Sequence, residues 1–244
     1  MRNAWVALTY LTVCSVVFLP GTQVTAEVFR ETFDDNQIDP AIWTMHVYGT
    51  GPQISPVNQQ LEISIPGSSS GRDFGAKLSS NFRLRGDFDI QVDFRLLVWP
   101  YGNGVRTALG RDSGFLYPPG LERISFGQND YPGAPRESYL TDFDGGVCGI
   151  TETSDITGTL RLVRTGSSQT GYYYHPSGQW VAVCTDSAPT DDMTIQLSAF
   201  TAYQFMGWDV LMAFDNFVVN SGELVDFPVP TLVTSWGAVK ALYR

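Results

Sequence analysis

The chain of 244 residues is long enough for one large or two small domains, and 43% hydrophobic against 16% charged residues predicts a packed core rather than global disorder. The formal net charge of −10 argues against nucleic acid, whose phosphates select basic surfaces, and against an anionic membrane surface. The only two histidines, His46 and His175, leave little material for a histidine-rich metal site or a histidine-based proton relay.

The first segment has the layout of a secretory signal peptide. Arg2 supplies a positive start, residues 4–19 carry no charge, and small residues precede a cleavage point that we predict after Ala26. The uncharged run is short for a membrane span, which needs about 20 residues. Cys14 is a poor acylation site for a lipoprotein because Val13, not a small residue, precedes it. We therefore expect residues 1–26 to be removed from a secreted or cell-surface protein.

Residues 87–96 alternate apolar and polar side chains without interruption. This period of two predicts a strand with one face in the core and one face in water. Shorter segments at 61–65, 160–162 and 193–199 repeat the pattern and predict further strands. The apolar face of the longest segment consists of Phe88, Ile90, Val92, Phe94 and Leu96.

Turn signals separate these segments. Residues 172–174 and 179–181 flank a Pro-Ser-Gly sequence at 176–178, which predicts a hairpin with its turn there. We find no long amphipathic helix in residues 27–222 and no internal repeat. Many short strands joined by glycine and proline turns predict an all-β sandwich or jelly roll.

Signal-peptide cleavage would remove Cys14 and leave two cysteines, Cys148 and Cys184. Exported proteins meet oxidising conditions, so we predict that these two residues form one disulfide. The alternative is a pair of separate buried thiols in a reducing compartment.

Several segments carry a resemblance to a known superfamily. In chain order they are residues 31–35, Trp43, 61–63, 86–90, the hairpin that ends at Trp180, and 214–219. Their order resembles the concanavalin A-like lectins and glucanases, which include laminarinases and laminin G-like domains. Over residues 27–222 this resemblance implies a jelly-roll sandwich of two curved antiparallel sheets, whose concave face often binds glycans.

The resemblance also suggests a metal site. Some members of the superfamily hold a structural calcium ion between the first and last strands. Asp34 or Asp35, together with Asp215, is the corresponding candidate here. Asp215 can equally cap a strand or accept a backbone hydrogen bond, and we expect that no cofactor is required.

Catalysis is not supported by the carboxylates of this sequence. Retaining glucanases of this fold carry E-x-D-x-x-E on one strand, because glycoside cleavage uses two carboxyl groups about 5 Å apart. Glu122 matches the first position, but Ile124 and Gly127 occupy the other two. No other segment has this spacing, so we expect no catalytic residues. The rival interpretation is a divergent glycoside hydrolase or lyase.

Aromatic residues are frequent, at 13% of the chain. Trp43, Trp180 and Trp208 lie in strand-like contexts, and we expect them in the core. Trp99 and Tyr101 instead lie in a polar turn. Exposed rings stack on the C–H faces of sugars, while neighbouring polar groups bind the hydroxyls.

We therefore predict a glycan site built from rings in loops and donors from nearby strands. The alternative is that prolines beside the tyrosines only stiffen these loops. The predicted ligand-binding residues are Trp99, Tyr101, Tyr117 and Tyr131, with Arg106 and Arg123 as hydrogen-bond donors.

The last segment, residues 223–244, has a different character. Two prolines lead to a sequence in which Ser235 can begin a short helix with an apolar side. The segment resembles the short basic tails of some exported bacterial proteins, and it can serve attachment to the cell surface or sorting. The alternative is a tail that packs on the sandwich.

Together these patterns predict an exported, non-catalytic carbohydrate-binding protein whose partner is a polysaccharide or other glycan. A glycoside hydrolase or lyase on the same fold is the first alternative. A surface or structural protein without a small ligand is the second.

Overall fold

The computed structural model describes residues 27–128, 132–144, 146–202 and 204–227. The predicted signal peptide and residues 228–244 of the predicted tail lie outside these ranges. All regular elements of the described residues are strands, which confirms the all-β prediction. They are β1 (Phe29–Glu31), β2 (Trp43–Thr50), β3 (Gln53–Val57), β4 (Gln60–Ile65), β5 (Ser70–Val98), β6 (Val105–Arg111), β7 (Gly120–Ser125), β8 (Glu137–Phe143), β9 (Gly146–Glu152), β10 (Thr157–Thr165), β11 (Ser168–His175), β12 (Gln179–Ser187), β13 (Met193–Ala202) and β14 (Val210–Val225).

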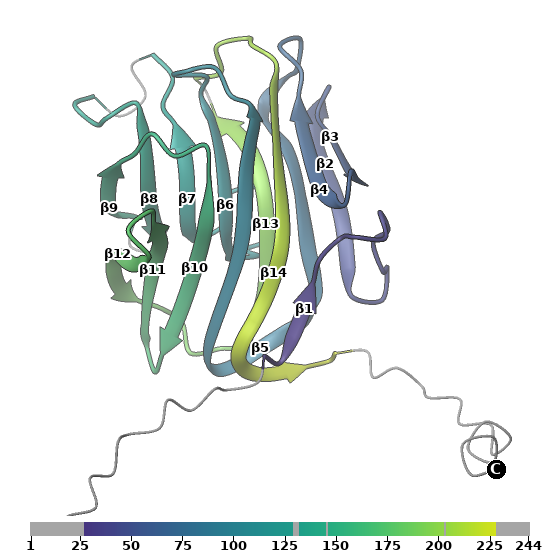
Figure 1. The fold of residues 1–244 in the computed structure, drawn as a ribbon, viewed down its shortest axis with the longest axis vertical. Helices are drawn as coiled ribbons and strands as arrows, with labels where there is room; N and C mark the ends of the chain where they lie inside the picture. Colours follow the sequence, from purple (N-terminus) through teal and green to yellow (C-terminus); the bar gives the residue numbers. More distant parts are fainter. Residues whose placement is uncertain (1–26, 129–131, 145, 203, 228–244) are drawn as a thin grey trace, which may run out of the picture.

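The strands form the two layers of a jelly-roll sandwich, with antiparallel pairing throughout (Figure 1). The first layer holds β12, β11, β10, the second half of β5, β14 and the short strands beside β14. The second layer holds β2, the first half of β5, β13, β6, β7, β8 and β9. The long strand β5 belongs to both layers, and its Leu84 pairs with Met193 of β13 and with Leu224 of β14.

The core lies between the two layers and follows the alternation of the sequence. In β5 the five apolar side chains predicted for one face are at most 7% exposed, because they point toward the opposite layer. Leu61 and Ile63 of β4 and Leu197 of β13 join the same core. The hairpin of β11 and β12 also has its predicted turn, since His175 pairs with Gln179 across residues 176–178.

Two of the three tryptophans expected in the core are not there. Trp43 is buried, at 1% exposure, but Trp208 is 43% exposed. Trp180 is half-buried on the outer face of β12, where its ring lies 4.9 Å from the guanidinium carbon of Arg161. The prediction was wrong for Trp180 because Val181, the next residue of the strand, takes the inward face.

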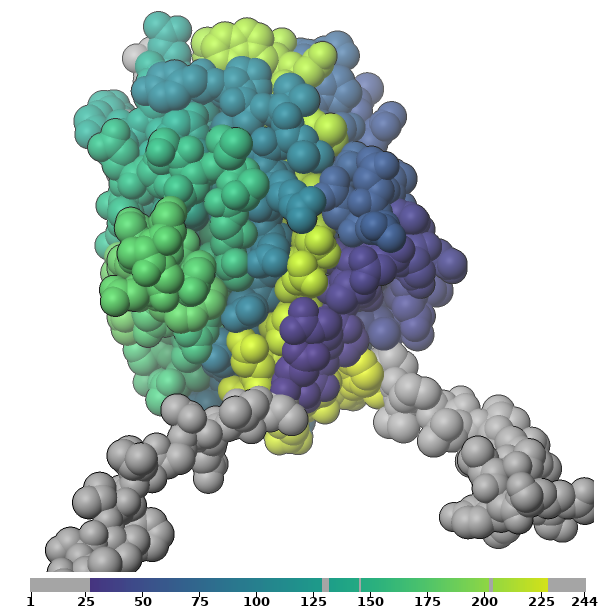
Figure 2. All heavy atoms as spheres, viewed as in Figure 1, coloured from purple at the N-terminus to yellow at the C-terminus, as the bar shows by residue number. Residues whose placement is uncertain are grey.

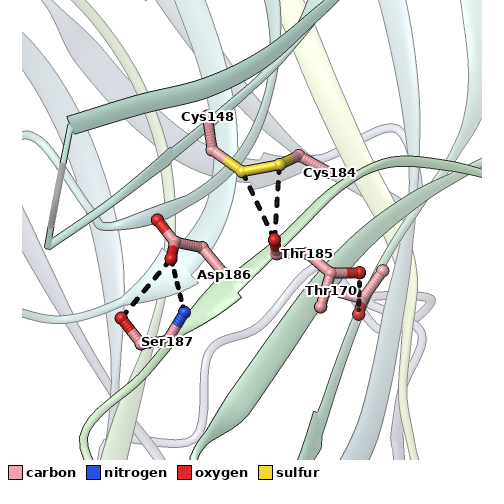
Figure 3. Close-up of a disulfide and its surroundings, with 6 residues drawn as sticks. All are labelled: Cys148, Thr170, Cys184, Thr185, Asp186 and Ser187. Atoms are coloured by element: carbon pink, nitrogen blue, oxygen red, sulfur yellow. Dashed lines mark hydrogen bonds between the residues drawn. A yellow bond between two sulfur atoms is a disulfide. The ribbon is translucent and has the colours of Figure 1, made fainter.

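A disulfide between Cys148 of β9 and Cys184 of β12 confirms the predicted pairing (Figure 3). Strands β12 and β9 are the two ends of the main path of paired strands, so the bond joins the edge of one layer to the edge of the other. Next to it, the hydroxyl groups of Thr170 and Thr185 lie 2.8 Å apart and connect β11 with β12. The disulfide therefore closes one open side of the sandwich.

The described chain begins and ends at the same end of the sandwich. Strand β1 pairs with β14, and in the space-filling view the purple N-terminal residues lie against the yellow surface of β14 (Figure 2). The rings of Phe29 and Phe227 lie 5.1 Å apart. Strand β14 continues to Val225, past the predicted domain boundary at residue 222, because Glu223 still pairs with Arg85 of β5. The described residues contain no helix with the length and hydropathy of a membrane span.

Candidate functional site

Residues 99–104 form a tight polar turn between β5 and β6, here called the aromatic turn. Tyr101 stands at its tip and is 69% exposed. Asn103 is fully buried and fixes the turn from within, since its amide donates to the carbonyl of Pro100 at 2.9 Å and its Oδ1 accepts from the backbone of Val105 at 2.6 Å. A buried asparagine with both ends bonded gives this turn one defined conformation.

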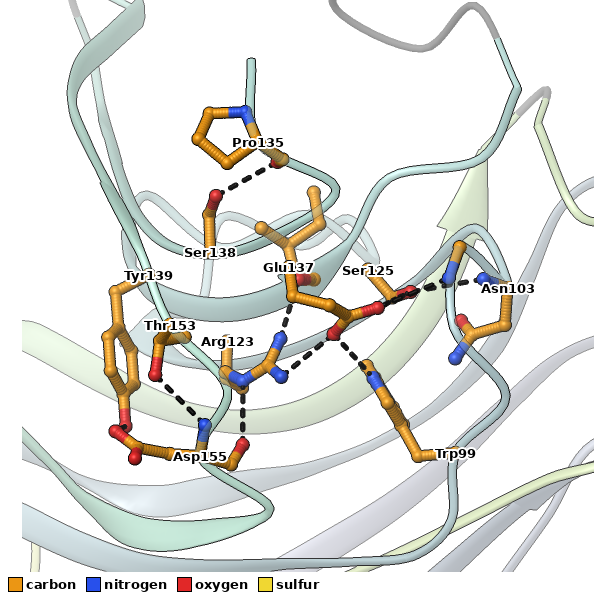
Figure 4. A network of polar contacts seen from close by, with 12 residues as sticks. Trp99, Asn103, Arg123, Ser125, Pro135, Glu137, Ser138, Tyr139, Thr153 and Asp155 are labelled. Atoms are coloured by element: carbon orange, nitrogen blue, oxygen red, sulfur yellow. Dashed lines mark hydrogen bonds and ion pairs between the residues drawn. The ribbon is translucent and has the colours of Figure 1, made fainter.

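The aromatic turn is held by the carboxylate of Glu137, at the start of β8 (Figure 4). The indole Nε1 of Trp99 donates to Oε2 of Glu137 at 3.0 Å, and Arg123 pairs with the same oxygen at 2.7 Å. The hydroxyl of Ser125 and the backbone N–H of Gly102, at 3.2 Å, donate to the other carboxylate oxygen. Four donors, two from the aromatic turn and two from β7, therefore converge on one largely buried carboxylate.

Arg123 is only 1% exposed and has its donors directed inward. Its Nε donates to the carbonyl of Asp155 at 3.1 Å, and its Nη1 donates to the carbonyl of Ile124 at 2.7 Å. The guanidinium carbon lies 5.9 Å from the centre of the Trp99 ring. Arg123 therefore has a positioning role, because its guanidinium connects Glu137 of β8 to the loop that follows β9.

A cleft of about 320 Å³ opens beside this network. Trp99 and Tyr101 line it, and so does the segment of residues 152–156, here called the saddle, through every residue but Asp155. Ile156 at the end of the saddle is 62% exposed, so the cleft combines rings, an aliphatic side chain and polar groups. Its lining consists of Trp99, Tyr101, Arg123, Arg136, Glu137, Glu152, Thr153, Ser154 and Ile156.

The structure brings three of the six predicted ligand-binding residues into this cleft, namely Trp99, Tyr101 and Arg123. Ligand binding by these residues stays a prediction. Sequence reasoning missed Glu137, which lies 38 positions from its partner Trp99 and has no local signature. Its place at the start of an alternating strand was the only available signal. Tyr131 lies outside the described residues.

Arg106 lies elsewhere, on the face of the second layer turned away from the core. It pairs with Glu122 of β7 at 3.5 Å. Asp142 of β8 lies diagonally across from Glu122, since Glu122 pairs with Leu140 in the register of the two strands. Burial raises the pKa of Asp142, and the charge of Arg106 opposes this shift only in part. Two carboxyl groups and a guanidinium therefore share this face.

The loop of residues 112–119, here called the covering loop, folds over part of the same face. Lys77, 2% exposed, donates to Asp112 at 2.8 Å and to the carbonyl of Phe115 at 3.2 Å. Gln196 donates to the carbonyl of Leu116 at 2.8 Å. Burial disfavours the charge of Asp112, but the hydrogen bonds from Lys77 and other donors outweigh this and hold its pKa below the usual value.

Tyr117 belongs to the covering loop and not to the cleft. Its ring packs edge-on against Phe200 at 5.0 Å, and its hydroxyl donates to Asp73. Glycan binding by Tyr117 stays a prediction; the structure shows that its ring packs on Phe200, away from the cleft. The physical reason is that Phe200 points out of the second layer and needs a covering side chain.

Two of the candidate calcium residues, Asp34 and Asp215, lie near one another. Asp34 lies close enough to raise the pKa of Asp215, but burial is the main cause of this increase. Asp35 accepts from the backbone of Gln37 at 2.9 Å, and Asp215 accepts from the backbone of Asn216 at 2.7 Å. Among the residues described here, no three His, Cys, Asp or Glu side chains gather around one point as metal ligands would. Calcium binding by Asp34, Asp35 and Asp215 stays a prediction.

No protein-family model matches the chain, and no curated protein matches its sequence. Solved structures do resemble it. A prokaryotic β-1,3-1,4-glucanase (lichenase) from a mouse hindgut metagenome is 14% identical, with a TM-score of 0.56 over 78% of this chain and 97% of that chain. A variant of LamA from Z. galactanivorans, in complex with laminaritriose and laminaritetraose, is 15% identical, with a TM-score of 0.51 over 80% of this chain and 99% of that chain.

Peanut lectin, solved with a nine-residue peptide, is 9% identical, with a TM-score of 0.52 over 82% of this chain and 99% of that chain. At these identities the likeness concerns the fold alone. The protein has the concanavalin A-like jelly-roll fold, which occurs in both glucanases and lectins.

Proposed function

We propose that this protein binds carbohydrate in the cleft between the aromatic turn and the saddle. The observation that carries the proposal is the pairing of a fixed indole, Trp99 on Glu137, with the exposed ring of Tyr101 at the mouth of the cleft. Rings present flat apolar faces to the C–H groups of a sugar, and nearby carboxylate, guanidinium and hydroxyl groups bind its hydroxyls. A fixed ring loses little side-chain freedom on binding, which favours affinity.

The comparisons support this proposal only through the fold. Glucanases and lectins share the fold, and one of the similar structures is a complex with laminaritriose and laminaritetraose. Fold alone does not determine function, so the cleft and its rings carry the argument.

A glycan array followed by calorimetry tests the proposal. We expect binding of at least one oligosaccharide, and we expect Tyr101→Ala to weaken it by about 1–3 kcal/mol, as removal of an aromatic anchor does. Phe115→Ala is the matched control, because Phe115 is 70% exposed and lies outside the cleft, on the covering loop. The proposal fails if no glycan binds, or if the two variants weaken binding equally.

A second candidate function is glycoside hydrolysis on the face that carries Glu122 and Asp142. A specific observation favours it: burial raises the pKa of Asp142, as a general acid requires, while Arg106 pairs with Glu122. Release of reducing ends from laminarin, agar or xylan tests this function. Activity that Glu122→Gln abolishes would establish hydrolysis. If no reducing ends are released, carbohydrate binding remains as the proposed function.

We also propose that the protein is exported. The support is the signal-peptide pattern of residues 1–26 and the disulfide, which needs an oxidising compartment. Expression of the full chain with N-terminal sequencing of the mature product tests this, and a first residue of Glu27 is expected. An uncut product that stays in the cytoplasm would contradict export.

A further inference from the structure

We propose that the glycan site continues across the saddle into a second, larger cavity, so that the ligand is a neutral chain of several sugars rather than a single sugar. This inference rests on the proposed function and extends it.

The two cavities share one wall. The second cavity has a volume of about 510 Å³, and Glu152, Thr153 and Ser154 line both it and the cleft. These residues belong to the saddle, which therefore separates the cavities by the width of a single loop. A chain that leaves the cleft over the saddle enters the second cavity without crossing another element.

The saddle is fixed from several sides. The backbone N–H of Thr153 donates to the carbonyl of Glu137 at 3.0 Å, and its hydroxyl accepts from the backbone of Asp155 at 3.0 Å. The carbonyl of Asp155 accepts from Arg123, and its carboxylate accepts from the Tyr139 hydroxyl at 2.9 Å. The network that holds the aromatic turn thus also holds the saddle, which lowers the ordering cost of binding.

The far wall of the second cavity comes from the hairpin of β11 and β12. The Tyr173 ring stacks on Tyr139 at 4.3 Å, with 13° between the ring planes, so the saddle and the hairpin share one aromatic support. His175 lines the cavity at the turn, where its Nδ1 lies 2.9 Å from the Ser177 hydroxyl. The disulfide ties β12 of this hairpin to β9, the strand that leads into the saddle.

The rim of the saddle offers unused polar groups. Across the described part of the chain, the side chains of Glu152 and Ser154 form no hydrogen bond or ion pair. A carboxylate and a hydroxyl between two cavities can accept and donate hydrogen bonds to sugar hydroxyls that pass over them. The cavities therefore provide ligand contacts on both sides of the saddle and at its crest.

The charge of the combined lining selects the class of sugar. The guanidinium groups of Arg123 and Arg136 face three carboxylates, which leaves the lining with a formal charge of −1. Arg123 is already paired with Glu137, so the carboxylates of Glu152 and Asp155 dominate the second cavity. A uronic acid or sulfated sugar would bring like charge beside them, which disfavours anionic glycans relative to neutral ones.

Calorimetry of the mature protein with β-1,3- and β-1,4-linked glucose oligomers of two and six units tests the inference. We expect the six-unit oligomer of one linkage to bind more tightly than its two-unit form. His175→Ala should weaken binding of the six-unit oligomer by about three- to tenfold, the value of one hydrogen bond, and leave the two-unit affinity unchanged. Tyr101→Ala should weaken both.

Ser177→Ala is the matched control, because it removes the partner of His175 in the turn but does not line the cavity. Equal losses in the two variants would overturn direct contact by His175. Equal affinities of the short and long oligomers, both sensitive to Tyr101→Ala, would overturn the continuation and leave the proposed function standing. No binding of either length in either linkage would count against both. A sulfated laminarin oligomer that binds as tightly as its neutral form would overturn the charge selection.

Discussion

The aromatic turn and the covering loop are both fastened by a buried ion pair, and they differ in what they leave open. Arg123 pairs with Glu137 at 2.7 Å behind the aromatic turn, and Lys77 pairs with Asp112 at 2.8 Å under the covering loop. Behind the turn, the pair lies to one side of a cleft and keeps a ring at its border. Under the covering loop, the pair holds the backbone of the loop against the sheet, so the loop covers this part of the sheet.

The comparison shows that a buried charge in this protein positions a loop, and that the fold around it decides whether a surface opens or closes. Both pairs are largely buried from solvent, and the side chains of Arg123 and Lys77 are each 2% exposed. Removal of one partner from such a pair leaves a charge without compensation, which is costly. Loss of one ion-pair partner should therefore destabilise either loop, but only at the aromatic turn should it also change the cleft.

The largest effect is expected for Lys77→Met. The substitution leaves the buried carboxylate of Asp112 without its cationic partner and the carbonyl of Phe115 without the Lys77 donor, so the free energy of unfolding should fall by about 3–5 kcal/mol. Urea denaturation measures it. Glycan binding at the cleft should survive in the folded fraction, and a loss below about 1 kcal/mol would show that the pair does not fasten the covering loop.

Reduction of the disulfide compares the contribution of a covalent link to stability with that of the buried ion pairs. The bond spans 36 positions between Cys148 and Cys184, and its loss should destabilise the protein by roughly 3–4 kcal/mol in the chain-entropy model. Denaturation with and without reductant measures this difference. Mass spectrometry of the non-reduced protein should show the linked peptides, and two alkylatable thiols in the exported protein would contradict the bond.

Glu137→Gln should cost less stability than Lys77→Met but should damage function. The glutamine keeps one acceptor for Trp99 or Arg123 and loses the charge that pairs with the guanidinium, so we expect a loss of about 2–3 kcal/mol. Glycan affinity should fall together with it, because the aromatic turn loses its support. Unchanged affinity in a folded variant would show that the turn is held without Glu137.

The smallest effect concerns pH. The folded pKa of Asp112 is lowered, so its stabilising contribution is complete above the unfolded pKa, about 4, and is lost as the pH falls through the lower folded value. Stability curves of the wild type and Asp112→Asn should therefore converge at acidic pH. Curves that stay parallel down to the acid transition would contradict the coupling of Asp112 to Lys77.

Features that lie within one segment of the chain were predictable from the sequence, whereas contacts between distant segments were not. The alternation in residues 87–96 was enough to predict a strand and its buried face, because every second side chain of a strand points the same way. The Cys148–Cys184 bond followed from there being only two cysteines after the predicted signal peptide. These features depend on spacing within one segment or on a count.

The candidate site depends on contacts that no local pattern contains. Glu137 meets Trp99 and Ser125 only because β8 lies beside β7 and the aromatic turn folds back on both. Tyr117 and Trp180 show the same limit, since their surroundings are set by neighbouring strands and loops. The sequence by itself determined strands, turns and the disulfide, because these follow from period and chemistry along the chain. Only the tertiary structure decided which loop covers the sheet and which borders a cleft, because that depends on which distant side chains pair with a buried charge.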